Sequence, residues 1–334
     1  MKVGVIGAGS WGTALAIIAG RAGHDVRLWS RNSAVVGSIN QEHLNPCYLK
    51  AARIPDNVRA SEVIREVAEA AELLILAAPS HATRELVSQV STVLRPETIV
   101  VSAAKGIEVE TGKRISEIVE EVVSETARPR FVCLSGPSFA KEVVENHPTA
   151  VVAAGADHEA TSVVQSALSV QNFRIYTNDD VVGTELAGSL KNVIAIAAGM
   201  VAGMGFGSNS LAALITRGLA EITRLAVNQG ARVETMIGLA GVGDLVLTCT
   251  GSLSRNRFVG EELGKARPLE EIQAQMSEVA EGVKTTRAAK ILADKVGIQM
   301  PITNEVHAVL YAKKLVRDAV AELMSRPLQT EKNW

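Results

Sequence analysis

The sequence predicts an α/β protein in which a doubly wound sheet domain is followed by an all-α domain. Short apolar runs alternate with helical stretches through the first half of the 334 residues. The runs LLILAA and IVVSAA are apolar on both faces, as is typical of parallel strands covered by helices. Beyond residue 178 only helical patterns follow. We therefore predict a sheet domain over residues 1–180 and a helical domain over 181–334, with the boundary near 178–182.

The first half alternates between predicted strands and predicted helices. The strands are expected at Lys2–Ile6, Asp25–Trp29, Leu73–Ala77, Thr98–Ser102, Phe131–Leu134, Ala150–Ala154 and Phe173–Tyr176. The helices are expected at Ser10–Ala22, Ala82–Leu94, Gly112–Ser124, Ala140–Glu145 and His158–Leu168.

The second half begins with a helix start at Asp179 and Asp180, followed by the apolar stretch VVGTELAGSLKNVIAIAAGMVAGMG. Further helices are expected at Leu211–Gln229, Arg232–Gly238, Ser254–Gly264, Leu269–Met276, Thr285–Lys295 and Asn304–Leu315. The tail SRPLQTEKNW is expected to fray.

The composition argues against several classes of protein. A net charge of −2 and 3% aromatic residues do not favour a nucleic-acid partner. The three cysteines, Cys47, Cys133 and Cys249, form no CxxC pair, which suits a reducing cytoplasm, and the histidines lack metal-ligand spacing. The start MKVGVIG does not resemble a signal peptide. The apolar stretch Val193 to Phe206 is shorter than the about 20 residues of a membrane span, so we expect a buried helix.

A glycine motif follows the first predicted strand and opens the first predicted helix. Gly7, Gly9 and Gly12 fit the pattern G-x-G-x-x-G. Gly7 would make the tight turn, Gly9 would let a pyrophosphate approach the backbone, and Gly12 would let the helix pack on the strand. The alternative is a glycine turn that holds no ligand. The flanking strand, helix and second strand favour a dinucleotide site.

The end of the second predicted strand indicates which dinucleotide is bound. A carboxylate there would accept a hydrogen bond from the ribose of NAD, but the chain reads Leu28-Trp29-Ser30-Arg31-Asn32. The guanidinium of Arg31 suits a 2′-phosphate, so NADP is favoured over NAD. The alternative is that Arg31 is a solvated turn residue.

Two polar segments follow strands of the sheet domain. Lys105, in SAAKG, is expected to face the cofactor crevice, because ligands bind outside the carboxyl ends of such strands; a solvated loop lysine is the alternative. Ser135–Ala140, reading SGPSFA, opens a helix whose free N–H groups suit substrate oxygens or the nicotinamide end of the cofactor; an ordinary helix cap is the alternative.

Two more polar segments lie in the helical domain. Lys191, flanked by AGSL and by apolar residues, suits a general base whose pKa is lowered by burial; the alternative is a snorkelling lysine. Asp244 follows glycines and could accept a hydrogen bond from a substrate hydroxyl or pair with a catalytic lysine. Ser254–Arg257 opens a helix with donors and positive charge, which suits a phosphate, or else forms a solvated basic turn. Cys249 is interpreted as a packing residue.

Taken in order, these segments resemble one family. GAGSWGTALA, SAAKGIE, SGPSFAKEV, ELAGSLKNVIAIAAG, GLAGVGDLVLTCTGSLSRNR and VAEGVKT are similar to bacterial NAD(P)-dependent sn-glycerol-3-phosphate dehydrogenase, from Lys2 to about Leu315. The resemblance implies a Rossmann-type first domain and a second domain like the C-terminal domain of 6-phosphogluconate dehydrogenase. It also implies reversible reduction of dihydroxyacetone phosphate to sn-glycerol 3-phosphate, which supplies glycerophospholipid synthesis in the cytoplasm.

The resemblance also assigns site residues. It implies that Lys191 is the catalytic proton acceptor. No metal is expected, because the cofactor carries the hydride and the substrate is already a ketone. The implied substrate contacts are Lys105, Gly136, Ser138, Lys191, Asn192, Asp244, Thr248, Ser254, Arg255 and Asn256. The implied cofactor contacts, besides the three glycines, are Ser10, Trp11, Arg31, Lys105, Ala140, Arg255, Val279 and Glu281. Asn32 stands where many relatives carry a second basic or polar residue.

Two other functions are weighed against this interpretation. One is a reductase of an unphosphorylated β-hydroxyacid or of ketopantoate, against which Arg255, Asn256 and Lys105 favour a phosphate. The other is a non-enzymatic dinucleotide sensor, which would need no pairing of Lys191 with Asp244. A small-molecule substrate is expected, with no nucleic acid and no membrane span, and a homodimer is left open.

Overall fold

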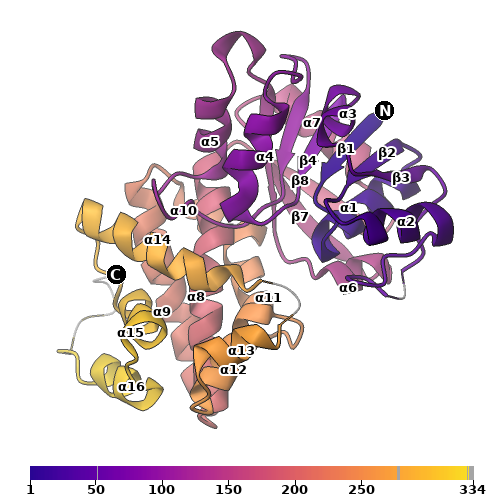
Figure 1. Cartoon of the computed structure of the whole chain (residues 1–334). Helices are drawn as coiled ribbons and strands as arrows, with labels where there is room; N and C mark the ends of the chain where they lie inside the picture. Colours follow the sequence, from indigo (N-terminus) through magenta and orange to yellow (C-terminus); the bar gives the residue numbers. More distant parts are fainter. Residues whose placement is uncertain (51, 277–278, 329, 331–334) are drawn as a thin grey trace. The chain divides into compact units, whose positions relative to one another are not determined.

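The computed structural model describes residues 1–50, 52–276, 279–328 and 330 (Figure 1). Its residues cluster into two compact units. The sheet unit comprises residues 1–104 and 115–181, and the helical unit comprises residues 105–114 and 182–334. The sequence predicts a single boundary near 178–182, whereas in the structure the segment Lys105–Arg114 also belongs to the helical unit.

The sheet unit contains eight strands in the order β3-β2-β1-β4-β5-β6-β7-β8. Their bounds are β1 Lys2–Ile6, β2 Asp25–Trp29, β3 Val58–Ser61, β4 Leu73–Leu76, β5 Ile99–Ser102, β6 Arg130–Ser135, β7 Thr149–Ala154 and β8 Phe173–Asn178. All neighbouring strands are parallel except β6 and β7, which pair antiparallel. The two runs that indicated parallel strands, in β4 and β5, do pair parallel, and the pattern of residues gave no indication of the antiparallel pair.

Helices cover both faces of this sheet. Alternate strand residues explain why: Val3 and Val5 of β1 belong to one apolar cluster, whereas Ile6 belongs to the other. The first cluster takes residues from α1 (Ser10–Arg21), α2 (Ser33–Glu42), α6 (Ala140–Val144) and α7 (His158–Leu168). The second takes residues from α3 (Ile64–Glu69), α4 (Thr83–Val90) and α5 (Ile115–Val122). The predicted doubly wound α/β class is confirmed.

Three elements between Arg31 and Glu72 are absent from the prediction, namely α2, β3 and α3. All three are short or bury few residues, and α3 has only six residues. In α2 only Val35 and Ile39 are buried, and in β3, the edge strand, only Val58 is. Periodicity needs several buried positions to be recognised, so such short elements at the margin of a sheet leave a weak signal.

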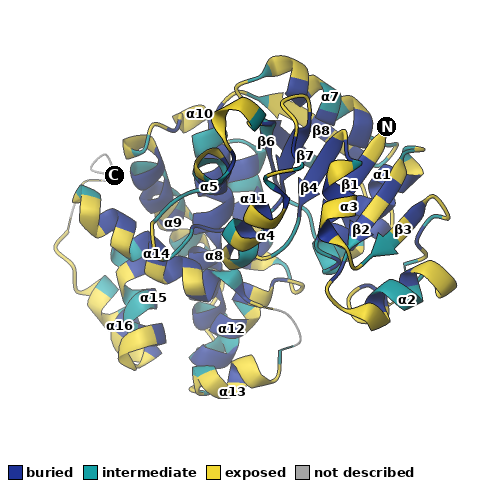
Figure 2. Cartoon of the chain, turned by 45° about the horizontal axis from the view of Figure 1, so that its top comes forward, coloured by how far each residue is buried: buried dark blue, intermediate teal, exposed yellow. Residues whose placement is uncertain are grey.

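The helical unit is built around α8 (Val181–Gly203). Figure 2 shows this helix dark blue along most of its length, and every residue from Gly183 to Met200 is buried. The other helices are α9 Ser208–Asn228, α10 Val233–Met236, α11 Asp244–Thr250, α12 Arg255–Gly264, α13 Leu269–Ala274, α14 Glu281–Val296, α15 Pro301–Ala312 and α16 Val316–Met324. Helices α11 and α16 were not predicted, and a π-helical turn, Leu239–Gly243, leads into α11.

Two apolar segments are long enough to cross a membrane by length and composition. They are Val181–Gly203 and Val233–Thr250. The first is longer than the stretch from Val193 to Phe206, so the length argument of the sequence analysis does not hold for the whole helix. However, 83% of its most apolar window is buried inside the protein, which is typical of a core helix. The second is divided among α10, the π-helical turn and α11.

Helices α8 and α12 approach each other through glycines. A Cβ on Gly199 would overlap the carbonyl oxygen of Arg257, and a Cβ on Gly260 would overlap that of Ile196. Gly203 and Gly264 meet farther along the same contact. Side chains larger than hydrogen would force the two helices apart, so these glycines fix the separation of α8 from α12.

This contact predicts that Gly260→Ala destabilises the protein by about 3 kcal/mol, the upper end of the usual cost of overpacking. The matched control is Gly37→Ala in α2, where a Cβ would meet nothing within 4 Å. That change should stabilise the protein by about 0.5–1 kcal/mol, because alanine favours helix over glycine. Urea unfolding followed by circular dichroism measures both. Equal effects of the two substitutions would contradict the close helix contact.

Candidate functional site

The glycine motif forms a backbone cradle at the start of α1. Gly7 has φ +113°, and a Cβ there would lie 2.8 Å from the amide nitrogen of Ala78. A Cβ on Gly12 would overlap the carbonyl oxygen of Gly7, whereas a Cβ on Gly9 would meet nothing within 4 Å. Gly9 is the N-cap of α1 and, having no side chain, does not itself cap the first N–H groups of the helix. These features fit a pyrophosphate bound on backbone.

A loop that the sequence analysis did not single out supports this cradle. Asn45 is fully buried, and its Nδ2 donates to the carbonyl oxygen of Ala8 at 2.9 Å and to Thr13 Oγ1 at 2.8 Å. Ser10 Oγ donates to the carbonyl oxygen of Tyr48 at 3.3 Å. The dipeptide Asn45-Pro46 was the available signal, because Asn before Pro favours a turn.

Trp11 lies within the motif and is partly buried. Its ring lies 6.5 Å from that of Phe173, measured between centroids, and packs on the sheet unit's core. Its indole Nε1 is buried and donates to no group of the residues that the structure describes. An N–H in this state is available to a ligand. The structure thus gives Trp11 both a packing contact and a free donor.

Arg31 follows β2 and is exposed. The next residue, Asn32, is the N-cap of α2, and its Oδ1 accepts hydrogen bonds from the amides of Ala34 at 3.0 Å and Val35 at 3.4 Å. Asn32 therefore has a structural task of its own. Arg31 is left as the cation at the end of β2.

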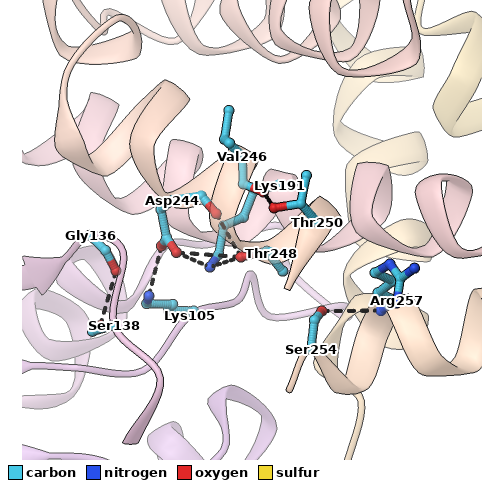
Figure 3. Close-up of polar contacts among 10 residues, drawn as sticks. All are labelled: Lys105, Gly136, Ser138, Lys191, Asp244, Val246, Thr248, Thr250, Ser254 and Arg257. Atoms are coloured by element: carbon cyan, nitrogen blue, oxygen red, sulfur yellow. Dashed lines mark hydrogen bonds and ion pairs between the residues drawn. The ribbon is translucent and has the colours of Figure 1, made fainter. Parts of the chain in front are cut away.

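The segment SGPSFA lies at the end of β6. Gly136 is buried with φ +134°, which favours glycine, and a Cβ there would lie 2.9 Å from Cα of Val151. Ser138 Oγ donates to the carbonyl oxygen of Gly136 at 3.0 Å (Figure 3). The N-cap of α6 is Phe139, with no side-chain cap, and Ala140 is the first helical residue. Neither serine of the segment caps α6, and substrate binding by this segment stays a prediction.

Lys191 and Asp244 form the centre of a buried polar cluster in the helical unit. Lys191 Nζ contacts Asp244 Oδ1 and donates to Thr248 Oγ1 at 2.7 Å (Figure 3). Lys105 Nζ donates to the other carboxylate oxygen of Asp244, Oδ2, at 2.7 Å. The hydroxyl of Thr248 donates to the carbonyl oxygen of Asp244 at 2.6 Å. One carboxylate thus holds two ammonium groups.

Local structure places these groups. Asp244 is the first residue of α11, after the π-helical turn, and Thr248 lies one helical turn later on the same face. A Cβ on Gly241 would overlap the backbone of Met236, so this tight turn requires glycine there. Lys191 has small neighbours, Ala187 and Gly188, on its face of α8, as the sequence indicated.

Burial decides the ionisation of Lys191. Its side chain is 6% exposed, which overturns the snorkelling alternative. Desolvation lowers the pKa of Lys191 from 10.5 to about 7. The negative charge of Asp244 opposes this shift, and the positive charge of Lys105 adds to it. At neutral pH the amine is therefore poised to accept or release a proton.

Two neighbouring interpretations are settled by burial. Lys105 is 17% exposed and ion-paired, so it is not a solvated loop lysine. Cys249 is fully buried, and desolvation raises the pKa of its thiol to about 12, which agrees with its interpretation as a packing residue.

The segment Ser254–Arg257 begins α12. Ser254 is the buried N-cap, and its Oγ accepts from the amide of Arg257 at 3.2 Å (Figure 3). Arg255 is exposed, which leaves the solvated-turn alternative open. Asn256 is buried, and its Oδ1 accepts from the amide of Gly282 at 2.9 Å.

Three helices meet around Asn256. A Cβ on Gly282, in the first turn of α14, would lie 2.7 Å from both Asn256 Oδ1 and the carbonyl oxygen of Asn192 on α8. Asn192 and Asn256 thus both lie against Gly282, where a larger residue would not fit. Glu281, partly exposed, precedes it, and Val279 is exposed before the helix. The sequence offered no signal for Val279 or Glu281 apart from the resemblance.

Comparisons with known proteins agree along the whole chain. The models of the N-terminus and the C-terminus of NAD-dependent glycerol-3-phosphate dehydrogenase match residues 2–161 and 180–321. The chain is 53% identical to a glycerol-3-phosphate dehydrogenase [NAD(P)+] of Koribacter versatilis, covering 99% of this chain and 98% of that protein. It is 50% identical to the one of Myxococcus xanthus, covering 99% of each. Its structure is similar to the crystal structure of glycerol-3-phosphate dehydrogenase from Coxiella burnetii, with a TM-score of 0.93 and 38% identity over 97% of this chain and 99% of that one.

The charges around Lys191 predict opposite shifts in two variants. Asp244→Asn should lower the pKa of Lys191 further, because a stabilising anion is lost. Lys105→Gln should raise it, because a repelling cation is lost; each shift should be about one unit or more. A pH titration of the 13C-labelled lysine Cε signals by NMR measures them, with Asp294→Asn on α14 as a control that leaves Lys191 unchanged. Shifts of the same sign would refute this account of the cluster.

Proposed function

The chain belongs to the NAD-dependent glycerol-3-phosphate dehydrogenase family and is an NAD(P)-dependent oxidoreductase, and we propose that Lys191 carries the proton in its reaction. The reaction is the reversible reduction of dihydroxyacetone phosphate to sn-glycerol 3-phosphate. The observation that carries the proposal is a buried amine with a pKa of about 7, held between Asp244 and Thr248. A base or acid is most effective when its pKa lies near the working pH.

The residues of the sheet unit fit a dinucleotide. Backbone at Gly7, Gly9 and Gly12 would hold the pyrophosphate, with Ser10 and Trp11 in the same turn. The cofactor, when bound, supplies or accepts the hydride. The family pattern adds Ala140, Val279 and Glu281 to the proposed cofactor contacts.

The residues of the helical unit perform the proton transfer. During oxidation, neutral Lys191 takes the proton of the substrate's C2 hydroxyl as the C2–O double bond forms. During reduction, the protonated Lys191 returns that proton to the oxygen. Lys105 holds the same oxygen and compensates its developing negative charge, and Asp244 keeps both ammonium groups in place.

The phosphate of the substrate requires donors and positive charge. We assign it to the start of α12, where Ser254, Arg255 and Asn256 follow one another. Gly136 and Ser138 are further proposed substrate contacts, on the family pattern. Fixing the phosphate would orient C2 toward Lys191 and lower the entropic part of the barrier.

Neither alternative function is favoured. Relatives that share about half of the residues over the full length are named glycerol-3-phosphate dehydrogenase, which argues against an unphosphorylated hydroxyacid as substrate. A dinucleotide sensor would not need an amine desolvated against Asp244. We also propose a cytoplasmic location and a supply role for glycerophospholipid synthesis, in keeping with three cysteines that form no disulfide among the described residues. A homodimer stays a prediction.

Replacing Lys191 by methionine tests the proposal. Lys191→Met keeps the volume of the side chain and leaves Asp244 paired with Lys105, so the fold should persist. Turnover of dihydroxyacetone phosphate, followed by NADPH absorbance, should fall by about a thousandfold or more, within the range that general acid–base catalysis supplies. NADPH affinity, measured by fluorescence quenching, should stay within about twofold, because the cradle lies in the sheet unit.

The control is Lys295→Met, at the exposed end of α14, which removes a lysine without touching the cluster. It should behave as the wild type does. A Lys191→Met enzyme with near wild-type kcat would disprove the catalytic assignment.

We further propose that NADP is preferred over NAD through Arg31. Arg31→Ala should lower kcat/KM for NADPH by about tenfold or more and leave that for NADH within about twofold, since only NADPH has a 2′-phosphate for the guanidinium. Steady-state kinetics with both cofactors measure the ratio. Arg27→Ala, an exposed arginine of β2, is the matched control. Equal losses for the two cofactors would remove Arg31 from the specificity site.

A further inference from the structure

A segment between β5 and α5 is built into the helical unit. In the sequence, Lys105–Arg114 lies between β5 and α5, which both belong to the sheet unit. In the structure, it belongs to the same compact unit as residues 182–334. Ile107 is 3% exposed and belongs to the helical core, and Val109 packs against the same core. The ten residues are therefore a part of the helical unit that the chain reaches by crossing twice.

Each end of this segment is held by an ion pair. Lys105 Nζ donates to Asp244 Oδ2 at 2.7 Å, and Arg114 Nη1 donates to Glu185 Oε2 at 2.9 Å. The Glu185 side chain is 5% exposed and that of Arg114 is 18% exposed. Glu185 lies on α8, six residues before Lys191. The segment is thus anchored at its start on α11, in its middle on the core, and at its end on α8.

We propose that Arg114 and Glu185 form a positioning pair, which fixes the end of the 105–114 segment on α8 and so keeps the Lys105 ammonium on Asp244. A lysine side chain has four rotatable bonds and loses considerable rotamer freedom when it is held in one geometry. Its backbone must therefore be fixed for the contact with Asp244 to persist. Arg114 does this beyond the apolar anchor at Ile107. The inference rests on the proposed function only in that Lys105 and Asp244 serve that reaction.

The position of Lys105 has a consequence at Lys191. Among the described residues, three charged or titratable groups act on Lys191: the carboxylate of Asp244, the ammonium of Lys105 and the thiol of Cys249. The positive charge of Arg257 acts in turn on that thiol. Of these, Lys105 lowers the pKa of Lys191 by repulsion. If Lys105 leaves Asp244, the repulsion weakens and the pKa of Lys191 rises. The acid limb of the oxidation profile would then move to higher pH, because a neutral Lys191 is needed there.

The experiment compares Arg114→Gln with the double variant Arg114→Gln/Glu185→Gln, which removes both charges and leaves no unpaired carboxylate buried. For the folded variants, the kcat of glycerol 3-phosphate oxidation should fall by about tenfold, and its pH midpoint should rise by about half a unit or more. In a Lys105→Gln background, Arg114→Gln should add no further shift of the midpoint, because the charge it positions is gone. Lys290→Gln, which breaks an exposed ion pair on α14, should leave the profile unchanged.

A second readout is independent of turnover. Labelling by an amine-reactive reagent, located by peptide mass spectrometry, should rise severalfold at Lys105 in both variants and stay constant at exposed Lys141. If Lys105 is labelled more in the variants but the wild type does not reduce dihydroxyacetone phosphate, the positioning role of Arg114 and Glu185 is supported and the proposed function is disproved. If the wild type is active and the variants lose only thermal stability, the proposed positioning role is disproved. In that case the pH midpoint and the labelling of Lys105 would both be unchanged.

Discussion

The desolvation of Lys191 is the constraint on which the chemistry of the helical unit depends. Helix α8 is buried on all sides, so any cation on it loses most of its hydration. An amine in this position needs partners, and α11 supplies them as Asp244 and Thr248. A π-helical turn, Leu239–Gly243, leads directly into α11. The pKa of about 7 therefore results from the packing of the helices as much as from the contacts of the amine itself.

The two units contribute different kinds of chemistry. The sheet unit offers mainly backbone: a glycine turn with φ +113° at Gly7, an open approach at Gly9 and a second turn at Gly136. The helical unit offers charge in low-dielectric surroundings, where Asp244 holds Lys105 and Lys191. Lys105 contributes to the charged cluster of the helical unit, although it follows β5 of the sheet unit by only a few residues. The crossing of segment 105–114 into the helical unit thus keeps both ammonium groups in one rigid environment.

Local pattern was sufficient for the elements with dense apolar signals. β1, β2 and α7 have the predicted bounds, because their runs are flanked by clear turns or by a capping Asp157. Local pattern was insufficient where an element has few apolar residues or where its structure depends on residues far away in the sequence. α11 follows the glycine-rich stretch GLAGVG, which is typical of a loop, but here the glycines permit a π-helical turn against Met236. The antiparallel direction of β7 is set by the path of the chain, which no residue within the strand specifies.

The candidate site shows the same division between residue types and residue pairs. Lys105, Lys191 and Asp244 each stood out because a charged residue in apolar or glycine-rich surroundings is costly unless it has a task. Their pairing joins positions 53 and 139 residues apart, and periodicity carries no information over such separations. Arg114 gave no signal, since it follows another charged residue, Lys113. Glu185 lies in the same apolar stretch as Lys191 but was not singled out, because its partner is 71 residues away in the sequence. An ion pair on the surface would contribute little to stability. The Glu185 side chain is buried on α8, however, so the loss of Arg114 would leave a desolvated carboxylate without this partner, which is costly.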